Sequence, residues 1–505
     1  MKNACTFSNG QSLPLSSVPP APWQDFCDRM LAECAAGARI VSFFGVPEQD
    51  MPKAVRISDA KGTQLRIFAV LARAAENVLA VAASVVNESY PSLTPLLPAM
   101  HLFERALHEQ YAVTPLGHPW LKPVRFPHDN GPRAGDMPFF QVGGEGVHEV
   151  AVGPVHAGVI EPGHFRFQCL GETVLHLEIS LGYQHRGIED ALKGGPHKNT
   201  FPVMETIAGD TSIGHAWAAC GIAEGLSGIP ASPRGLVLRA IALELERLAN
   251  HTGDLGALSG DVGFLPSASY CGRIRGDFLN MTASLCGNRF GRNCIRPGGV
   301  IVDVNEDTAN DIDRRVHAAC RDVRGAMRLF FDAPSVTARM MGTGVLSKQA
   351  ALDMGMVGPA ARASDVPVDT RKTHPLPGME EFIPHLCTEK SGDILARSTV
   401  RMREIRESAT LVGRLLKLLP RGETYAPQEG KLAPLSFAAS LVEGWRGEIC
   451  HAALTDDTGH YARYSVTDPS FHNWMGLALA MREQTISDFP LCNKSFNLSY
   501  CGCDL

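Results

Sequence analysis

The segment NEDTANDIDRRVHAACRDVRGAMRLFF, residues 305–331, repeats its apolar residues every three or four positions. The residues that follow this spacing are Ile312, Val316, Ala319, Val323, Met327 and Phe330. The spacing places them on one face of an α-helix. Residues 395–416 repeat it until Pro420, and residues 237–248 repeat it after Ser232 and Pro233, an N-cap and a first helical residue. Because three such helices bury their apolar faces against one another, we expect a helical bundle.

On either side of these helices lie segments in which apolar residues alternate with other residues, a pattern typical of β-hairpins. Apolar residues alternate in 165–169 and again in 175–181, and Gly171 and Glu172 between them favour a turn. Residues 448–454 and 461–466 predict a second hairpin. We therefore expect hairpins at the ends of the bundle.

The N-terminal region mixes strand-like and helical segments. Residues 39–44 and 64–70 carry the β-branched and aromatic residues of strands, and residues 100–111 predict a helix. Residues 65–86 fit either a helix or strands. The stretch 128–146 is rich in Gly, Pro and polar residues, which is typical of a linker.

The fold class expected from these elements is α+β, and the chain is long enough for at least two domains. We expect an N-terminal α/β domain over residues 1–130, a linker over 131–150, and a helical-bundle domain with hairpins over 151–505.

Composition narrows the class of protein. The 505 residues carry a formal charge of −6, which argues against nucleic acid as a partner, because a nucleic-acid binder needs a basic surface. The most apolar stretch, 65–86, contains Arg66, Arg73 and Glu76, so no membrane-spanning helix is predicted. The N-terminal residues lack the apolar core of a signal peptide, and fourteen cysteines indicate a reducing compartment. We expect a cytoplasmic location.

Common enzyme motifs are absent from the sequence. It contains no P-loop, no H-E-x-x-H, no G-x-S-x-G and no pair of C-x-x-C motifs. Gly342-Thr343-Gly344 lacks the third glycine of a dinucleotide-binding loop, so NAD binding is not supported. Because these motifs are absent, we expect this chain to bind no cofactor of its own.

Four segments concentrate polar residues. The first, 153–164, carries His156 and His164 on a Gly/Pro-rich turn, where imidazoles suit proton transfer or simply lie in a surface loop. The second, 183–189, reads YQHRGIE and favours a site or a structural His–Arg–Glu network equally. The third and fourth segments are 205–215 and 492–505.

In the third segment, Asp210, Thr211 and Ser212 are suited to capping a helix. His215 lies inside that helix, where a histidine is more often hydrogen-bonded in the core than bound to a metal. In the fourth segment, Cys501 and Cys503 offer two of the four ligands that a closed metal site requires.

Taken in order, these segments resemble the large subunits of membrane-bound energy-converting [NiFe] hydrogenases of the formate hydrogenlyase type, which are related to the quinone-site core subunit of respiratory complex I. The motifs that carry the resemblance are Glu104-Arg105 with Gly117-His118-Pro119, Gly153–Phe167, Tyr183–Glu189, Arg296–Gly299, Val357–Pro359, Arg362–Ser364, Asp369–Arg371 and Glu443–Gly447. The first of these resembles the end of an accessory domain that complex I carries as a separate subunit. The resemblance implies that this domain is fused ahead of the large subunit here.

The sequence departs from the hydrogenase pattern at the metal ligands. Hydrogenases of this family hold nickel and iron with four cysteines, because thiolates are the soft ligands that these metals require. The aligned positions here are Ala208, Thr211, Ser499 and Gly502, so the resemblance does not extend to a [NiFe] centre. Cys501 and Cys503 lie beside the last pair and are candidates only for a rearranged ligand set.

The resemblance implies a peripheral subunit that passes electrons between an iron–sulfur cluster of a partner and a quinone or another small acceptor. Among the site residues, His164, with His156 nearby, would donate or relay a proton, Asp210 would supply a carboxylate, and Arg446 would supply a fixed charge or, alternatively, a buried ion pair that orders the C-terminus. The expected cleft lies between the loop around His164 and residues 205–215. The expected partners are a small subunit with a [4Fe–4S] cluster and membrane subunits of an antiporter-like assembly, which places the chain on the inner face of the cell membrane.

Two alternatives remain. One is an active hydrogenase with ligands rearranged around Cys492, Cys501 and Cys503, and the other is a scaffold subunit without chemistry. We also expect residues 495–505 to fill the cleft near Ala208, with Arg446 offsetting the charge of Asp504.

Overall fold

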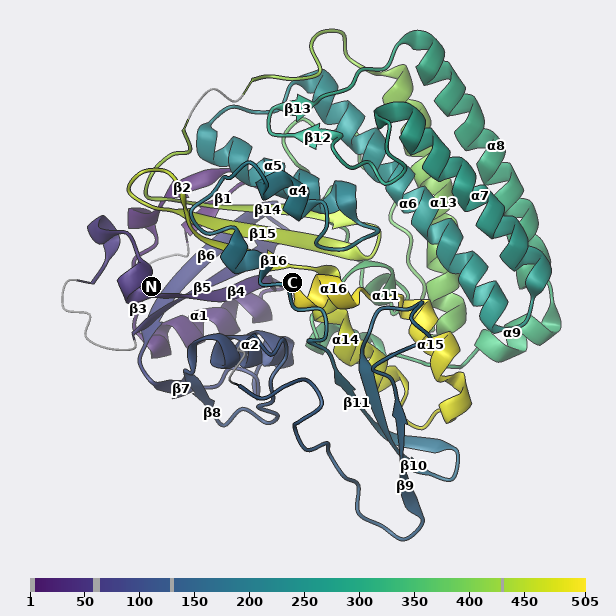
Figure 1. Cartoon of the computed structure of the whole chain (residues 1–505), viewed down its shortest axis with the longest axis horizontal. Coiled ribbons are helices and arrows are strands. Elements are labelled where there is room, and N and C mark those ends of the chain that lie inside the picture. The colour runs from purple at the N-terminus through teal and green to yellow at the C-terminus, as the bar shows by residue number, and fades with distance from the viewer. Residues whose placement is uncertain (1–4, 58–63, 128–130, 428–430) are drawn as a thin grey trace.

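The computed structural model describes residues 5–57, 64–127, 131–427 and 431–505. An α+β fold is confirmed, with an N-terminal sheet at one side and a bundle of long helices at the other (Figure 1). The C-terminal helices lie between these two parts. No helix of the described residues is long and apolar enough to cross a membrane.

The N-terminal sheet has the strand order β1-β6-β5-β4, and β3 pairs in parallel with β6. Its strands are β1 (Cys5–Phe7), β3 (Pro20–Ala21), β4 (Arg39–Pro47), β5 (Leu65–Arg73) and β6 (Val78–Val86). The helices of this part are α1 (Trp23–Ala35) and α2 (His101–Tyr111), and a small parallel pair is formed by β7 (Ser89–Pro91) and β8 (Thr114–Leu116). Short 3₁₀ turns are η1 (Leu15–Ser17), η2 (Glu48–Asp50), η3 (Lys53–Val55), η4 (Pro98–Met100) and η5 (Ile486–Asp488).

The ambiguous residues 65–86 form two antiparallel strands rather than a helix. Both faces of these strands are covered. Ile67 and Leu71 belong to the main core, whereas Phe68 and Val70 pack in a second core together with Phe437. Strands buried on both faces lose the alternation that would identify them, which explains why the sequence pattern left two readings.

The second sheet joins the two ends of the chain. It has the order β16-β15-β14-β2, formed by β2 (Ser12–Pro14), β14 (Ser436–Gly444), β15 (Gly447–Thr455) and β16 (Tyr461–Thr467). Strands β15 and β16 confirm the second predicted hairpin. Since β2 pairs with β14 and Phe68 stacks on Phe437 at 6.1 Å between ring centroids, the N-terminal region and the C-terminal sheet share one core.

The bundle contains four long helices, α6 (Pro233–Asp261), α7 (Leu265–Cys286), α8 (Glu306–Phe331) and α13 (Ile394–Lys417), beside the buried α5 (Ser212–Ser227). The predicted cap at Ser232 is confirmed, because its hydroxyl accepts a hydrogen bond from the Gly235 N–H at 3.1 Å. Helix α7 was not predicted from the sequence patterns. Its signal is present in the spacing of the buried residues Cys271, Ile274, Phe278, Met281 and Leu285.

The first predicted hairpin consists of β10 (His164–Leu170) and β11 (Thr173–Ser180), and β9 (Val147–Val152) adds a third strand. Strand β9 therefore takes up residues 147–150 of the linker expected over 131–150. Residues 128–130 of the Gly/Pro-rich stretch 128–146 lie outside the described residues. The remaining short elements are α3 (Ile188–Ala191), α4 (Thr200–Met204), β12 (Ile295–Arg296), β13 (Gly299–Val300), α9 (Pro334–Met340), α10 (Lys348–Asp353), α11 (Gly358–Arg362), α12 (Thr370–Thr373), α14 (Pro469–Ala480), α15 (Phe489–Phe496) and α16 (Tyr500–Asp504).

Candidate functional site

Arg446, which is buried, and Asp210, which is half-buried, form an ion pair at the junction of the sheet, the bundle and the C-terminus. The two guanidinium Nη atoms of Arg446 donate to the two carboxylate oxygens of Asp210 at 2.5 and 2.8 Å. The Arg446 Nε donates to the backbone carbonyl of Asn497 at 2.6 Å, and its guanidinium lies over the Trp445 ring at 3.9 Å. Although burial opposes the charged form, the charge of Asp210 raises the pKa of Arg446 above its ordinary value. Arg446 therefore orders the C-terminal segment through a buried pair, which is the alternative that the sequence had left open.

The turn between β14 and β15 holds Arg446 in this position. Gly358, at the start of α11, packs directly against the turn, and a Cβ on Gly358 would lie 1.9 Å from the Arg446 carbonyl oxygen. Its φ of +69° also favours glycine. The contact leaves no room for a side chain at position 358.

His215 lies in the core and is hydrogen-bonded through both ring nitrogens, as expected. Its Nε2 lies 3.1 Å from the Asp468 carboxylate and its Nδ1 lies 3.1 Å from Nε2 of His451. The Nδ1 of His451 lies 2.9 Å from the hydroxyl of Tyr464. Burial would raise the pKa of Asp468, but the hydrogen bond from His215 and the charge of Arg446 outweigh it and hold that pKa below its ordinary value. None of Asp468, His451 and Tyr464 was predicted as a site residue from the sequence, because isolated polar residues on buried elements leave no spacing signal.

The four positions aligned with the metal ligands hold groups that do not suit a nickel–iron centre. Ala208 is apolar, and the Thr211 hydroxyl accepts hydrogen bonds from the Trp445 indole at 3.1 Å and from Arg446 at 3.3 Å. The Ser499 hydroxyl caps α16 by accepting the Gly502 N–H at 3.0 Å. None of these groups is a thiolate, so the residues present do not fit the four-cysteine site.

The neighbouring cysteines are buried thiols. Burial raises the pKa of Cys501 to about 12 and the pKa of Cys492 to about 11, and it raises the pKa of Cys503 well above its ordinary value. Thiolates bind metals and protonated thiols do not. Within the described ranges, no three His, Cys, Asp or Glu side chains are grouped so that they could hold a metal ion.

The loop 153–163 is folded onto itself by its two histidines. The Nε2 of His156 lies 2.9 Å from the carbonyl of Gly163, and the Nδ1 of His164 lies 3.2 Å from the carbonyl of Gly153. Burial lowers the pKa of His164. Its Nε2 is buried and has no hydrogen-bond partner among the described residues. A neutral His164 that donates from Nδ1 has a free lone pair on Nε2, so it can accept a proton there.

The C-terminal helix α16 packs against this loop. The carboxylate of Glu161 accepts hydrogen bonds from the backbone N–H groups of Tyr500 at 3.2 Å and Cys501 at 3.4 Å. A Cβ on Gly163 would lie 2.5 Å from the Tyr500 ring. The structure thus brings Asp210 and Arg446 together, and among the described residues neither forms a hydrogen bond or ion pair with His156 or His164.

The C-terminus is buried, as predicted, but Arg446 does not offset the charge of Asp504. Instead, Asp504 accepts hydrogen bonds from the backbone N–H groups of Gly182 and Gln184 at 2.8 and 2.9 Å. Arg446 is occupied by Asp210, which is why that part of the prediction was wrong. Burial raises the pKa of Asp504 to about 6.

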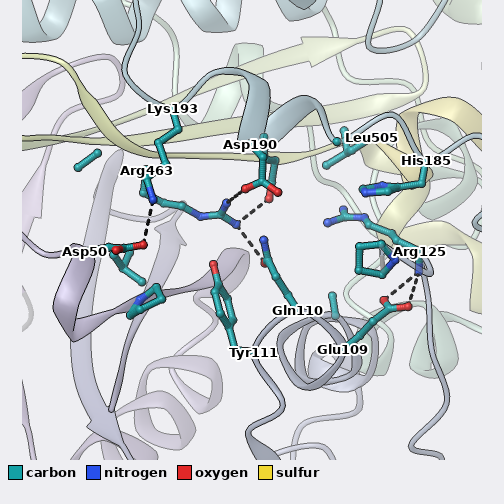
Figure 2. Close-up of a pocket in the computed structure, with 17 residues that line it drawn as sticks. Asp50, Glu109, Gln110, Tyr111, Arg125, His185, Asp190, Lys193, Arg463 and Leu505 are labelled. Carbon is teal, nitrogen blue, oxygen red and sulfur yellow. Dashed lines mark hydrogen bonds and ion pairs between the residues drawn. The ribbon is translucent and has the colours of Figure 1, made fainter. Parts of the chain in front are cut away.

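The segment 183–189 holds the C-terminus in place. The Nδ1 of His185 lies 2.8 Å from the carbonyl of Asp504, and the Arg186 N–H donates to the carbonyl of Leu505 at 2.6 Å. Beside it lies a polar cavity of about 240 Å³, in which Glu189 binds Arg463 and Asp50 binds Lys193 (Figure 2).

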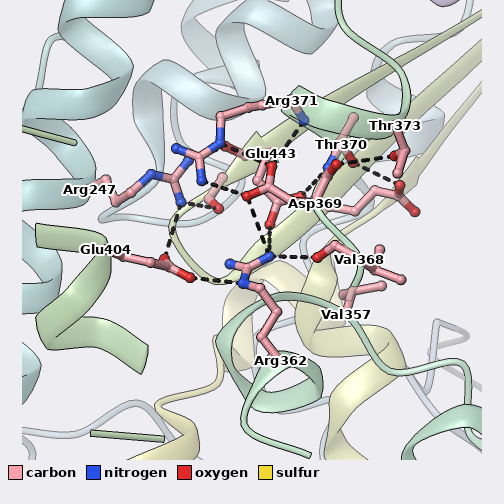
Figure 3. Close-up of polar contacts among 12 residues, drawn as sticks. Arg247, Val357, Arg362, Val368, Asp369, Thr370, Arg371, Thr373, Glu404 and Glu443 are labelled. Atoms are coloured by element: carbon pink, nitrogen blue, oxygen red, sulfur yellow. Dashed lines mark hydrogen bonds and ion pairs between the residues drawn. The ribbon is translucent and has the colours of Figure 1, made fainter. Parts of the chain in front are cut away.

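Several of the remaining family-like motifs meet in one buried ionic cluster (Figure 3). Arg362 donates to Glu404 at 2.8 Å and to Glu443 at 2.7 Å. Arg371 pairs with Asp369 at 2.6 Å. These motifs therefore stabilise the junction of α11, α12, α13 and β14.

Comparison with known proteins identifies relatives for both parts of the chain. Residues 17–139 match the family described as respiratory-chain NADH dehydrogenase, 30 Kd subunit, and residues 261–436 match the family described as the 49 Kd subunit. The carbon monoxide-induced hydrogenase of Rhodospirillum rubrum is 30% identical over 69% of this chain and 97% of its own length. Formate hydrogenlyase subunit 5 of Escherichia coli is 29% identical over 81% of this chain and 76% of its own length. NADH-quinone oxidoreductase subunit 4 of Thermus thermophilus is 28% identical over 67% of this chain and 89% of its own length.

Proposed function

Because the chain belongs to the family of complex I-related hydrogenase-type subunits, with its 30 kDa-like and 49 kDa-like parts in one polypeptide, we propose that it transfers electrons without a [NiFe] centre. Its donor is an iron–sulfur cluster of a small partner subunit, and its acceptor is a quinone or another small molecule. The partner cluster is a [4Fe–4S] cluster, and this chain holds no cofactor of its own. The assembly lies on the inner face of the cell membrane, attached to membrane subunits.

The observation that supports this proposal is the ion pair between Asp210 and Arg446, which lies beside the positions where hydrogenases carry thiolates. Thr211 donates to Asp210 at 3.2 Å, and Ser499 caps α16, so their hydroxyls already take part in hydrogen bonds of the fold. A nickel–iron pair would need four deprotonated cysteines at Ala208, Thr211, Ser499 and Gly502. We therefore assign the chemistry of this subunit to electron and proton transfer at the acceptor.

The group suited to move a proton is His164. Its Nδ1 is directed to the Gly153 carbonyl, and its buried Nε2 is free to accept a proton from a ligand or to return one. His156 fixes the loop that carries it. Asp210 and Arg446 act on this site through the C-terminal segment, which Arg446 orders by its bond to the Asn497 carbonyl.

The alternative hydrogenase with rearranged ligands has less support. Cys492 lies 3.9 Å from Nη2 of Arg397, Cys501 lies 3.5 Å from the Ser499 hydroxyl, and the carbonyl of Cys503 binds Arg125. The three residues thus have separate surroundings. The second alternative is a scaffold subunit that takes no part in the chemistry. It predicts that the complex keeps its activity when the residue at position 164 is changed.

The test uses the intact complex, purified with its partner subunits. We expect no nickel by elemental analysis, no cyanide bands in the infrared spectrum, and reduction of a short-chain quinone by the reduced complex. Stoichiometric nickel with cyanide bands would establish the hydrogenase alternative instead. The variant His164→Gln should lower the rate and alter its pH profile, whereas the exposed His148→Gln should not. Equal rates in both variants would favour the scaffold.

A further inference from the structure

A second cavity lies between α2, β11 and α14, which come from the beginning, the middle and the end of the chain (Figure 1). Its volume is about 270 Å³. Most of its wall is apolar and consists of Leu102, Val124, Leu177, Leu181, Met475 and Ala478. We call it the Trp474 cavity. None of its lining residues is His164, Asp210 or Arg446, so it is separate from the site described above.

Two hydrogen-bonding groups in this wall have no partner. Trp474 is only 3% exposed, and its indole Nε1 finds no acceptor among the described residues. The Nε2 of His176 is likewise buried and unpaired. An indole N–H can only donate, and leaving it buried without an acceptor costs free energy. An acceptor atom of a bound molecule would remove that cost.

The same cavity carries positive charge that the fold does not neutralise. Arg105 is 8% exposed, and its guanidinium donates to the backbone carbonyls of Lys122 at 2.7 Å and Pro123 at 2.9 Å. No carboxylate within the described ranges forms an ion pair with it. Burial lowers the pKa of Arg105 to about 10, which the charges of Glu109 and Glu178 only partly offset.

The acidic residue that lines the cavity is already occupied. Glu178 accepts hydrogen bonds from Lys122 at 2.6 Å and from the Phe140 N–H at 2.7 Å. Arg482, which is exposed, adds a second cation to the lining. The polar cavity of Figure 2 differs in this respect, because Arg463 and Lys193 in it are paired with Glu189 and Asp50.

We propose that the Trp474 cavity binds a small organic anion. This ligand has one or two apolar rings and one carboxylate. Its carboxylate accepts hydrogen bonds from Trp474 and Arg105, and its rings lie against the leucines of α2 and β11. Such a ligand combines the two features of the site, a donor-rich cationic end and an apolar wall. The backbone carbonyls that already bind Arg105 keep its guanidinium in place for the ligand.

The test is a binding measurement on the intact complex by isothermal titration calorimetry, with two matched pairs of probes. These pairs are benzoate with benzamide and 2-naphthoate with 2-naphthamide. The neutral amide has nearly the shape of the acid but lacks its charge. We expect at least one acid to bind with a stoichiometry of one per chain and at least tenfold more tightly than its amide.

Variants assign this binding to the cavity. Trp474→Phe keeps an aromatic ring and removes the unpaired N–H, so we expect a fivefold to tenfold loss of affinity for the acid. Arg482→Gln should weaken binding severalfold. The matched control Trp23→Phe removes an indole that binds the Pro91 carbonyl in the N-terminal region, and it should leave the affinity unchanged.

Three outcomes would overturn the proposal. Equal affinity for acid and amide would show a purely apolar site, which suits a neutral ring such as a quinone headgroup. Unchanged affinity in both cavity variants would place the binding elsewhere, and no binding of either acid at millimolar concentration would show that the cavity does not take this class. Because the readout is binding, its result is independent of nickel content and of electron transfer.

Discussion

Arg446 and Asp210 lie 236 positions apart in the chain and form a two-pronged ion pair, with N–O distances of 2.5 and 2.8 Å. The side chain of Arg446 is 5% exposed, and that of Asp210 is 33% exposed. The pair ties the β14–β15 turn to the start of α5, and the bond from Arg446 to the carbonyl of Asn497 adds the C-terminus. Three separate segments of the chain therefore depend on one guanidinium.

The first prediction concerns this pair. Asp210→Asn leaves the buried guanidinium without its carboxylate, so we expect a loss of about 3 kcal/mol in the free energy of unfolding. In the double variant Asp210→Asn/Arg446→Met no uncompensated charge remains, and at least half of that loss should return. Urea titration of the complex measures both. Arg328→Met, which removes an exposed partner of Asp332, is the control and should cost no more than about 0.5 kcal/mol. Additive losses in the double variant would contradict the coupling.

The second prediction concerns the C-terminus. Deleting Ser499–Leu505 leaves the Glu161 carboxylate without the N–H groups that it binds and removes the acceptor of the Arg186 N–H. We expect a loss of several kcal/mol, on the order of 3–5, because buried charges and polar groups lose their partners. The thermal midpoint of the complex and the recovery of its subunits report the effect. Leu505→Ala, which keeps the backbone bond to Arg186, should destabilise far less. An unchanged midpoint after the deletion would show that the segment is dispensable.

The third prediction concerns pH. Glu246 is buried and binds the N–H groups of Ile213 and Gly214, and burial raises its pKa to about 8. From about pH 4.5 to 8 the folded state thus holds one more proton than the unfolded state, so stability falls as pH rises, by at most about 1.4 kcal/mol per pH unit. Glu246→Gln cannot ionise.

The stability of Glu246→Gln relative to the native chain should therefore increase steadily from pH 5.5 to about pH 8 and then level off. Denaturant titrations at one-unit intervals measure this difference. The exposed Glu306→Gln is the matched control, and its difference from the native chain should stay constant with pH. A constant difference for Glu246→Gln as well would show that Glu246 ionises normally.

The fourth prediction concerns the buried cluster of Figure 3. Arg362 is fully buried between Glu404 and Glu443, so Arg362→Met removes the guanidinium that bonds both carboxylates and leaves Glu404 with Arg247 at 4.0 Å. We expect a loss of about 3–5 kcal/mol. Arg403→Met breaks a largely exposed pair with Glu389 and should cost about 1 kcal/mol or less. Similar losses in the two variants would show that burial adds nothing to the cluster.

Local sequence patterns predicted three of the long helices and both hairpins, but not α7 or most of the short elements. The helical period and the cap at Ser232 located α6, and the alternation around Gly171 located the β10–β11 hairpin. The region 65–86 stayed ambiguous because both faces of its strands are covered, by the main core on one side and by residues such as Phe437 on the other. Whether these residues form strands or a helix depends on their packing against a sheet that lies more than 350 positions further along the chain.

The sequence by itself determined the α+β class, the order of the family motifs and the loss of thiolates at Ala208, Thr211, Ser499 and Gly502. These properties depend on residue identity and on short spacings, which a single chain displays directly. Only the tertiary structure decided that Arg446 binds Asp210 rather than Asp504, and that α16 packs against the loop that leads to His164. Both carboxylates carry the same charge, so composition cannot rank them. The choice follows from which segments pack together, and that packing is the sum of many weak contacts between residues far apart in the sequence.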